Sequence, residues 1–345
     1  MRVALVTDAW LPQTNGVVRT LGITVEMLRS RGHDVTVIEP GTFRTFPCPT
    51  YPEIRLAWRP YRNVAARLEE HSPDAVHIAT EGPLGMAARR WCRRRGHPFT
   101  TSYHTQFPEY VRARVPIPLA WSYAYLRRFH GRAARTMVAT PSMQRLLESR
   151  GFGNVVRWSR GVDVELFRPR EQDLYDLPRP ISLFVGRVAV EKNIEDFLRL
   201  DLPGTKVVVG DGPARAELEI AHPRVVFTGY RYGEELAAHV AAADVFVFPS
   251  RTDTFGLVLL EAMACGVPVA AYPVTGPIDV VRDGVTGVLS EDLRTAALRA
   301  LELDRTACRE YALGFTWDRA TDQFFGNLAP RPSLAQSSAA VPATR

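Results

Sequence analysis

Lysine is almost absent from this chain of 345 residues: it occurs only at Lys192 and Lys206, so nearly all of the 43 basic side chains are arginine. Cysteine is also scarce. Its four positions, 48, 92, 265 and 308, fit neither the spacing of a metal site nor the density of a secreted disulfide scaffold, so we expect four reduced cysteines.

Long apolar runs and several enzyme motifs are missing as well. No run approaches the roughly 18 apolar residues of a membrane span, and the first ten residues reach Asp8 without the apolar core of a signal peptide. We therefore expect a cytoplasmic protein. The sequence has no GxSxG elbow, no HExxH and no Asp-x-Asp pair of the kind that holds a metal, so we expect neither a metal ion nor a cofactor.

The charge is distributed unevenly along the chain. Residues 1–165 hold 24 arginines and 13 acidic residues, a net charge of +11, whereas the remainder holds 19 basic and 24 acidic residues, a net charge of −5. Such asymmetry predicts that the first half meets an anionic partner, a membrane surface or a nucleic acid. No nucleic-acid-binding module accompanies it, which favours the membrane. An arginine excess that follows genome composition is the alternative.

Apolar periodicity predicts alternating strands and helices. Residues 2–7 form a short apolar run, residues 16–31 show helical spacing, and residues 34–38 form the next buried run, which together make a βαβ unit. Further strands are predicted at 75–78, 99–103 and 137–140, and then at 181–185, 206–209, 225–227, 245–248 and 267–271. The fold class is therefore α/β, with two doubly wound, Rossmann-like domains facing across a cleft.

The chain length also favours two domains. We predict a basic, membrane-facing, acceptor-side N-terminal domain, a Pro-rich linker, a C-terminal domain that binds the nucleotide part of a ligand, a C-terminal helix that returns to the first domain and a disordered tail. These segments cover residues 1–167, 168–180, 181–316, 317–328 and 329–345, respectively.

Two short motifs indicate anion binding. Asn15-Gly16 ends the loop after the first strand, where glycine lets the backbone approach a ligand and a helix N-terminus offers N–H groups; an ordinary βα turn is the alternative. In the second domain Gly186-Arg187 follows the strand ISLFV, with Lys192 five residues after Arg187. Two cations there suit a diphosphate, although a solvated helix start would show the same residues.

The most informative stretch is PSRTDTFGLVLLEAMACG, residues 249–266. Asp253 and Glu261 stand eight residues apart, and a turn at Thr254-Phe255-Gly256 is expected to open a helix near Leu257. Asp253 can accept sugar hydroxyls, the amides of the first helical turn can hold phosphate, and Glu261 can accept ribose hydroxyls. The alternative is a buried helix with two incidental acids.

Together these motifs resemble those of family 4 of the retaining glycosyltransferases, which have the GT-B fold. The resemblance covers residues 1–328 and includes GVDVELFRP (161–169) and GVPVAA (266–271); Asp253 departs from it, standing where the family's Glu-x7-Glu motif begins with Glu. PCPTYPEIRLA (47–57), ATEGPLG (79–85), FTTSYHTQFPEY (99–110) and AYPVTGPIDVV (271–281) are most similar to sulfoquinovosyl-diacylglycerol synthases and bacterial mannosyl-, glucosyl- and glucuronosyltransferases that act on lipids.

The resemblance implies an activity and its residues. His104 corresponds to a histidine beside the donor sugar, with a packing role as the alternative, and the expected catalytic set is His104, Arg187, Lys192, Asp253 and Glu261. We expect metal-independent transfer, with retention, of a hexose-type sugar from a UDP- or GDP-sugar to a membrane lipid such as diacylglycerol. A soluble or polysaccharide acceptor, a sugar-nucleotide epimerase and an inactive nucleotide-sugar-binding protein remain alternatives.

Basic and aromatic residues gather in two stretches that suit an anionic lipid surface. One holds Arg89, Arg90 and Arg93 to Arg95; the other runs from Arg112 to Arg135 and includes Trp121, Tyr123, Tyr125, Leu126 and Phe129. These stretches predict a peripheral position on the cytoplasmic face of the inner membrane. A solvated helix face above ordinary core aromatics is the alternative.

Overall fold

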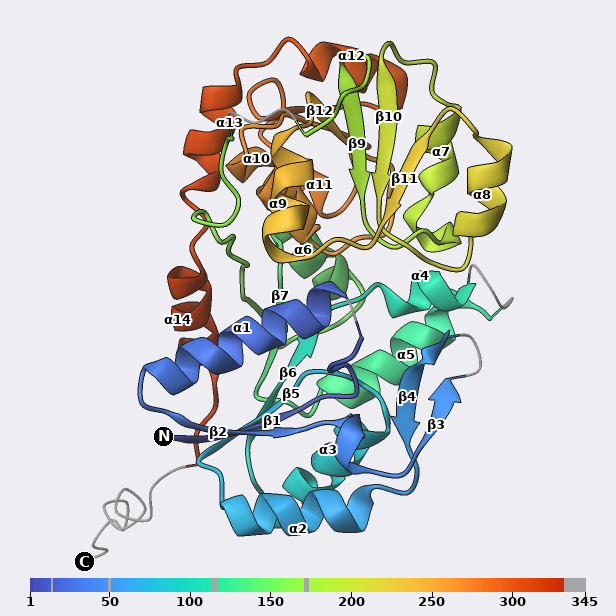
Figure 1. Ribbon diagram of the computed structural model, residues 1–345. Coiled ribbons are helices and arrows are strands. Elements are labelled where there is room, and N and C mark those ends of the chain that lie inside the picture. The colour runs from blue at the N-terminus through green and yellow to red at the C-terminus, as the bar shows by residue number, and fades with distance from the viewer. Residues whose placement is uncertain (14, 49–50, 113–116, 171–173, 332–345) are drawn as a thin grey trace, which may run out of the picture.

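Two six-stranded parallel sheets organise the chain (Figure 1). This computed structural model describes residues 1–331 apart from 14, 49–50, 113–116 and 171–173. Part of the predicted linker and most of the predicted disordered tail lie outside the described residues. The two sheets agree with the predicted class of two Rossmann-like α/β domains.

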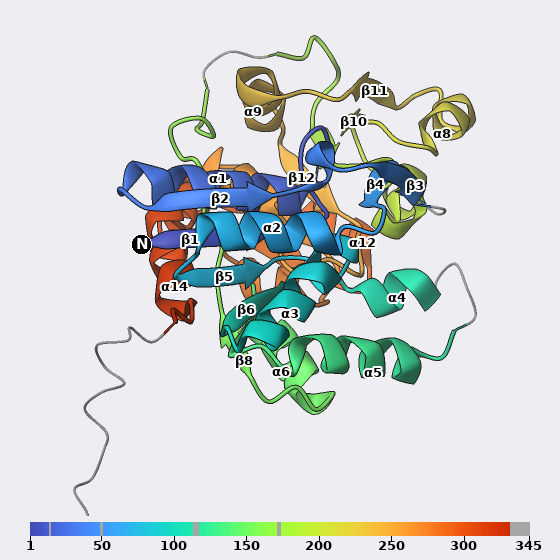
Figure 2. The same cartoon turned by 90° about the horizontal axis from the view of Figure 1, so that it is seen from below.

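The first sheet belongs to the N-terminal domain, and Figure 2 shows its strands following one another across the molecule. Its order is β2 (Asp34–Ile38), β1 (Arg2–Val6), β5 (Ala75–Ile78), β6 (Phe99–Tyr103), β7 (Arg135–Val138) and β8 (Val155–Arg157). The helices of this domain are α1 (Gly16–Ser30), α2 (Tyr61–His71), α3 (Pro83–Arg95), α4 (Phe107–Arg112), α5 (Leu119–His130) and α6 (Pro141–Ser149), with a 3-10 turn η1 (Pro40–Thr42).

The second sheet belongs to the C-terminal domain. Its order is β11 (Val226–Gly229), β10 (Thr205–Val209), β9 (Ile181–Val185), β12 (Val245–Phe248), β13 (Val269–Ala271) and β14 (Gly287–Leu289). Its helices are η2 (Val190–Lys192), α7 (Ile194–Arg199), α8 (Arg215–Ala221), α9 (Gly233–Ala241), α10 (Leu257–Ala264), α11 (Pro277–Val280), α12 (Leu293–Ala300) and α13 (Arg305–Ala312).

An antiparallel hairpin, β3 (Thr45–Cys48) and β4 (Tyr51–Ala57), stands apart from both sheets. The sequence pattern did not predict it. Prolines at 47, 49 and 52 interrupt the alternation by which a strand is recognised.

The first helix shows how the sequence positions an element. Asn15 caps α1, since its side-chain oxygen accepts hydrogen bonds from the N–H groups of Val17 and Val18 at 3.0 Å. Leu21, Val25 and Leu28 then share one buried face against the sheet. The helix ends where Gly32 takes a φ of 80°.

The last helix, α14 (Trp317–Asn327), lies against α1 on the N-terminal domain (Figure 1). Phe324 is fully buried in the cluster that holds Leu21 of α1, and Arg31 forms ion pairs with Asp318 and Asp322, each at 2.7 Å. The chain therefore crosses the domain boundary a second time before it ends.

Candidate active site at the domain boundary

The loop that follows β12 leads into α10 through a left-handed glycine. Gly256 has a φ of 82°, and a Cβ there would lie 2.9 Å from the Leu259 side chain and 3.2 Å from Phe248. Only glycine fits this turn without strain. Helix α10 begins at Leu257, and no side chain of the described residues caps its N-terminus, so its first N–H groups can bind an anion.

The other residues of the turn connect the two domains. Thr254 Oγ1 donates to the His104 carbonyl at 2.7 Å, and Gln106 Nε2 donates to the Asp253 carbonyl at 3.4 Å. Phe255 is buried in the core of the C-terminal domain. The residues after β6 and β12 thus contact each other, so the carboxyl ends of the two sheets face the same boundary.

Lys192 and Asp253 form an ion pair within the candidate site. The Lys192 Nζ lies 2.7 Å and 2.9 Å from the two carboxylate oxygens of Asp253. Arg187 follows Gly186 at the end of β9, and its Nε lies 4.0 Å from Glu191 Oε1. Of the two predicted diphosphate cations, Lys192 therefore sits beside the predicted sugar-binding carboxylate, whereas Arg187 contacts the residue that precedes Lys192.

Glu261 lies on α10 and is 3% exposed. Its Oε1 contacts the guanidinium of Arg19, on α1 of the other domain, whereas its buried Oε2 has no hydrogen-bond partner among the described residues. Burial raises the pKa of Glu261, and the charge of Arg19 opposes this shift. A buried acceptor without a donor is costly, so Oε2 is suited to receive a ligand hydroxyl.

His104 is held on both ring nitrogens. Arg160 Nη2 lies 3.3 Å from Nδ1, and Ser102 Oγ lies 2.8 Å from Nε2. A guanidinium only donates, so Nδ1 accepts and Nε2 carries the proton that is donated to Ser102. Burial and the nearby charge of Arg160 lower the pKa of His104 well below its usual value, so the ring is neutral at physiological pH. Because its pKa is low and its Nδ1 lone pair is engaged by Arg160, the ring is a weak base.

Asn15 and Gly16 lie next to α10. A Cβ on Gly16 would stand 3.6 Å from the Leu257 side chain, so the first loop reaches the helix N-terminus expected to bind phosphate. The Asn15 side-chain oxygen is already used to cap α1. What the loop can offer a ligand is therefore its backbone and the remaining capacity of the Asn15 amide.

Three residues of this boundary were not among the predicted site residues: Arg19, Arg160 and Asp279. Asp279 accepts the backbone N–H of Ser142 across the boundary at 3.1 Å, and the buried guanidinium of Arg160 stacks on Trp158 at 4.3 Å and donates to His104 Nδ1 at 3.3 Å. Burial lowers the pKa of Arg160 to about 9. Each depends on a partner far away in the sequence, so no local motif signals it.

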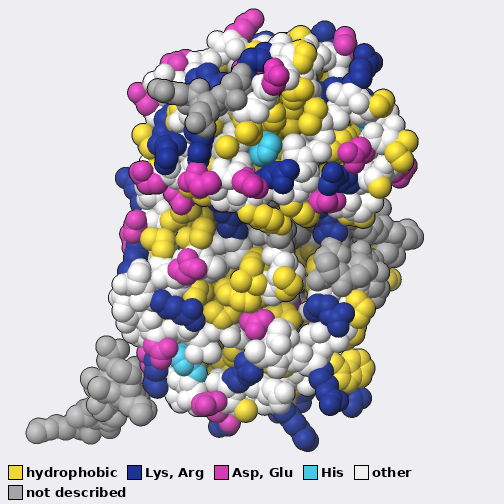
Figure 3. Space-filling model, in the orientation of Figure 1, with side chains coloured by type: hydrophobic (Ala, Val, Ile, Leu, Met, Phe, Trp, Pro, Cys, Tyr) yellow, Lys and Arg dark blue, Asp and Glu magenta, His cyan; other side chains and the backbone are white. Residues whose placement is uncertain are grey.

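The prediction that residues 89–95 form an exposed basic surface is wrong at one residue. Arg89 was expected on a lipid-facing surface, but it is 8% exposed and donates from Nε to the Phe129 carbonyl at 2.9 Å and from Nη2 to the Arg128 carbonyl at 2.6 Å. Arg89 thus supplies hydrogen-bond donors to two carbonyl groups at the C-terminal end of α5. Arg90, Arg93, Arg94 and Arg95 are exposed as expected, and Figure 3 shows basic side chains scattered over the N-terminal half rather than gathered in one band on the face that it draws.

Helix α5 divides its aromatic residues between core and surface. Tyr123, Leu126 and Phe129 are buried, whereas Trp121 is 72% exposed. Tyr125, Ile117 and Phe107 of α4 are exposed too, so an apolar surface follows α4 and α5; Arg114 lies outside the described residues. No described helix combines the length and the apolar composition that a bilayer crossing requires.

The described residues hold no group of three or more His, Cys, Asp or Glu side chains arranged as metal ligands. Metal independence stays a prediction.

Known proteins resemble the chain along nearly all of its length. It is 34% identical over 363 residues to a GDP-mannose-dependent alpha-mannosyltransferase of Mycobacterium tuberculosis, covering 95% of this chain and 96% of that one. It is 31% identical to the sulfoquinovosyl transferase SQD2 of Arabidopsis thaliana, covering 86% and 67%, and 27% identical to an alpha-monoglucosyldiacylglycerol synthase of Streptococcus pneumoniae, covering 87% and 78%.

Family models and solved structures agree. The model described as Glycosyltransferase Family 4 matches residues 14–166, and the model described as Glycosyl transferases group 1 matches residues 179–303. Sucrose-phosphate synthase of Thermosynechococcus elongatus has the same fold, with a TM-score of 0.73 at 22% identity, covering 94% of this chain and 97% of that one. The chain is thus a member of glycosyltransferase family 4 with the GT-B fold.

Proposed function

We propose that the chain transfers a hexose-type sugar from a UDP- or GDP-sugar to a hydroxyl of a membrane lipid, with retention of configuration and without a metal ion. The observation that carries the proposal is the assembly of Lys192, Asp253 and Glu261 around the N-terminus of α10, opposite His104.

Each residue has a chemical task in this reaction. When the bond between the anomeric carbon and the diphosphate breaks, its electron pair passes to a phosphate oxygen, and Arg187, Lys192 and the α10 amides stabilise that charge. Asp253 accepts sugar hydroxyls, and Glu261 Oε2 accepts a ribose hydroxyl. The neutral His104 lies beside the sugar.

The acceptor hydroxyl is proposed to approach on the face that the diphosphate leaves. Its oxygen bonds to the anomeric carbon, and its proton passes to the departing phosphate oxygen. This step needs neither a protein nucleophile nor a strong general base, which is consistent with a His104 whose two nitrogens are already engaged.

Two observations support a lipid acceptor. A relative that matches 87% of this chain is named as an alpha-monoglucosyldiacylglycerol synthase, and Phe107 of α4, Trp121 of α5 and Ile117 between these helices are exposed in a stretch that also holds arginines. Interfacial tryptophan with basic neighbours suits the headgroup region of an anionic bilayer. We accordingly propose a peripheral position on the cytoplasmic face of the inner membrane.

The test measures sugar transfer from a panel of UDP- and GDP-sugars to membrane lipids, for the wild type, Lys192→Ala and Arg187→Ala. We expect each substitution to lower turnover by roughly 100-fold or more, because each removes a charge that stabilises the leaving diphosphate. Arg224→Ala, at an exposed arginine of the same domain, is the control.

Unchanged turnover in both variants would refute the diphosphate assignment. Activity is expected to persist in excess EDTA, and a loss that Mg²⁺ or Mn²⁺ restores would refute metal independence. Conversion of the donor without any acceptor would identify an epimerase instead.

A further inference from the structure

The loop between β5 and α3 is built tightly around one buried carboxylate. Asp8, two residues after β1, accepts hydrogen bonds from the N–H of Leu84 at 2.9 Å, the N–H of Gly85 at 3.3 Å and the hydroxyl of Thr80 at 2.8 Å. A Cβ on Gly82 would lie 2.4 Å from Asp8 Cγ, and one on Gly85 would lie 1.9 Å from the Thr80 carbonyl oxygen. These contacts hold the loop in place, and with it the backbone of Glu81.

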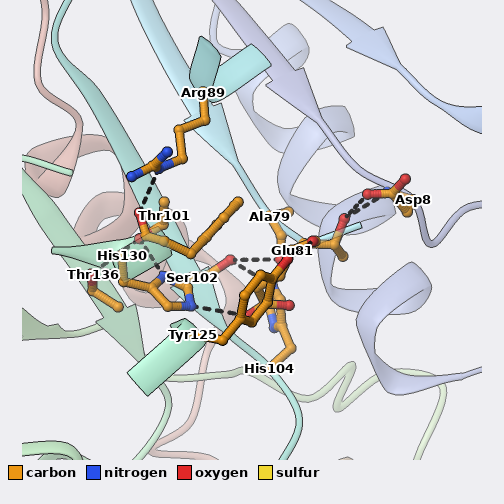
Figure 4. A network of polar contacts seen from close by, with 12 residues as sticks. Asp8, Ala79, Glu81, Arg89, Thr101, Ser102, His104, Tyr125, His130 and Thr136 are labelled. Carbon is orange, nitrogen blue, oxygen red and sulfur yellow. Dashed lines mark hydrogen bonds and ion pairs between the residues drawn. The ribbon is translucent and has the colours of Figure 1, made fainter. Parts of the chain in front are cut away.

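A buried histidine holds one oxygen of the Glu81 carboxylate, and the other oxygen stays available. The fully buried His130 contacts Glu81 Oε1 through Nε2 at 3.0 Å, and its own Nδ1 lies 2.9 Å from Thr101 Oγ1 (Figure 4). The Glu81 side chain is 26% exposed, and its Oε2 has no hydrogen-bond partner among the described residues. One carboxylate oxygen is thus anchored while the other faces solvent.

Strand register places Glu81 at the same edge of the sheet as His104. Strands β5 and β6 are parallel neighbours in which Ile78 pairs with Thr101, so Glu81 and His104 each lie three residues beyond paired positions. His104 in turn contacts Thr254, next to Asp253. Figure 4 shows Glu81, Tyr125 and His104 gathered at the same end of the polar network.

Tyr125 completes this group. Its hydroxyl donates to the Glu81 carbonyl at 3.3 Å, and the residue is 46% exposed. An anchored carboxylate beside a partly exposed aromatic ring offers a strong hydroxyl acceptor and an apolar face together. A sugar or polyol presents the matching hydroxyls and C–H groups, whereas diacylglycerol has a single hydroxyl and no ring.

We propose that Glu81 and Tyr125 form the acceptor subsite, and that the acceptor presents a polyhydroxylated group, a sugar or a polyol, to the donor. This inference rests on the proposed transferase function and narrows its acceptor: a lipid is used when its head carries such a group. Glu81 binds hydroxyls that neighbour the reacting one, and His130 positions Glu81.

The experiment measures how the donor sugar is partitioned between transfer and hydrolysis, for the wild type and Glu81→Gln. The probes are methyl and octyl glycosides of glucose and mannose, with dioleoylglycerol vesicles as the third arm. Losing a charge-assisted hydrogen bond is expected to lower the ratio of transfer to hydrolysis by about 10- to 100-fold. Glu70→Gln, at an exposed carboxylate of α2, is the matched control and should keep the wild-type ratio.

Several outcomes decide the inference. Preferential transfer to octyl glycosides over methyl glycosides supports a lipid-linked sugar as the acceptor. Equal transfer to both supports a free sugar. Either result supports the proposed subsite. Transfer to dioleoylglycerol alone, transfer to no probe at all, or a wild-type ratio in Glu81→Gln overturns it.

If the wild type turns over no donor, the proposed function fails, and binding of octyl glycosides by calorimetry then tests the subsite alone. Weaker binding in Glu81→Gln supports the subsite, and equal binding or none overturns it.

Discussion

Arg19 contacts Glu261 across the domain boundary, although 242 residues separate them in the sequence. This cation and Lys192 each form an ion pair with one of the two carboxylates expected to bind the donor. Because Arg19 uses only one oxygen of Glu261, we interpret it as a residue that keeps the buried carboxyl charged while Oε2 stays available for ribose.

Arg19→Met should therefore change the pH dependence of nucleotide binding. Burial raises the pKa of Glu261, and without Arg19 the carboxyl stays protonated to higher pH. UDP or GDP should bind more weakly near neutrality and recover affinity as the pH rises, as measured by calorimetric titration across a pH series.

The comparison for this prediction is Glu261→Gln. We expect it to weaken binding by about 1–3 kcal/mol with no recovery at high pH, because the amide cannot ionise. A loss in Arg19→Met that is independent of pH would contradict the assigned role.

The buried carboxyl of Asp8 is expected to make the free energy of unfolding depend on pH. Burial raises its pKa from 3.8 to about 6, so its contribution to stability is fully present below 3.8 and is lost as the pH rises through 6. The free energy of unfolding of the wild type, relative to Asp8→Asn, should fall by on the order of 3 kcal/mol across this window. Chemical denaturation of both proteins over the pH range measures the difference, and a constant difference would show that Asp8 does not titrate there.

At the scale of elements, the sequence pattern was strongest where strands and helices are long. Helix α1 was expected at 16–31 and ends at Ser30, and α10 begins at the expected Leu257. The pattern missed β8 and β14, which have three residues each and show too little alternation to recognise. Predicted strand edges shifted as well: β11 covers Val226–Gly229 rather than 225–227.

The same limit explains the error at Arg89. Five arginines on one helix predicted an exposed face. In the structure Arg89 of α3 instead points into the protein and donates to carbonyl groups at the end of α5. Which helical face is buried depends on the neighbouring helix, which a single sequence does not show. Likewise the motifs singled out Lys192, Asp253 and Glu261 as candidate site residues, whereas Arg19 and Glu81 became candidates only from the fold.

The membrane prediction belongs to α3 and α5. Trp121→Ser should weaken binding to anionic vesicles, because its exposed ring no longer enters the headgroup region; Ile220→Ser, on the other domain, is the control with similar exposure. Replacing Arg90, Arg93, Arg94 and Arg95 with Gln, and leaving the structural Arg89, should reduce the effect of lipid charge and of salt. Vesicle binding that is unchanged both in Trp121→Ser and in the arginine variant would mean that this surface does not contact lipid.

At the scale of the whole molecule, two sheets meet at their carboxyl ends, and the candidate site is shared between them. Arg19 and His104 come from the N-terminal domain, and Lys192, Asp253 and Glu261 come from the C-terminal one. Helix α14 ties the end of the second domain back onto α1. Chemistry at the boundary therefore depends on how the domains are held together.

The most direct test of this account is the anomeric configuration of the product formed from an α-linked GDP-mannose or UDP-glucose donor, read by NMR of the purified product. Retention through attack on the leaving face predicts an α-linked glycoside. A β-linked glycoside, or an isomerised donor with no glycoside formed, would contradict the account.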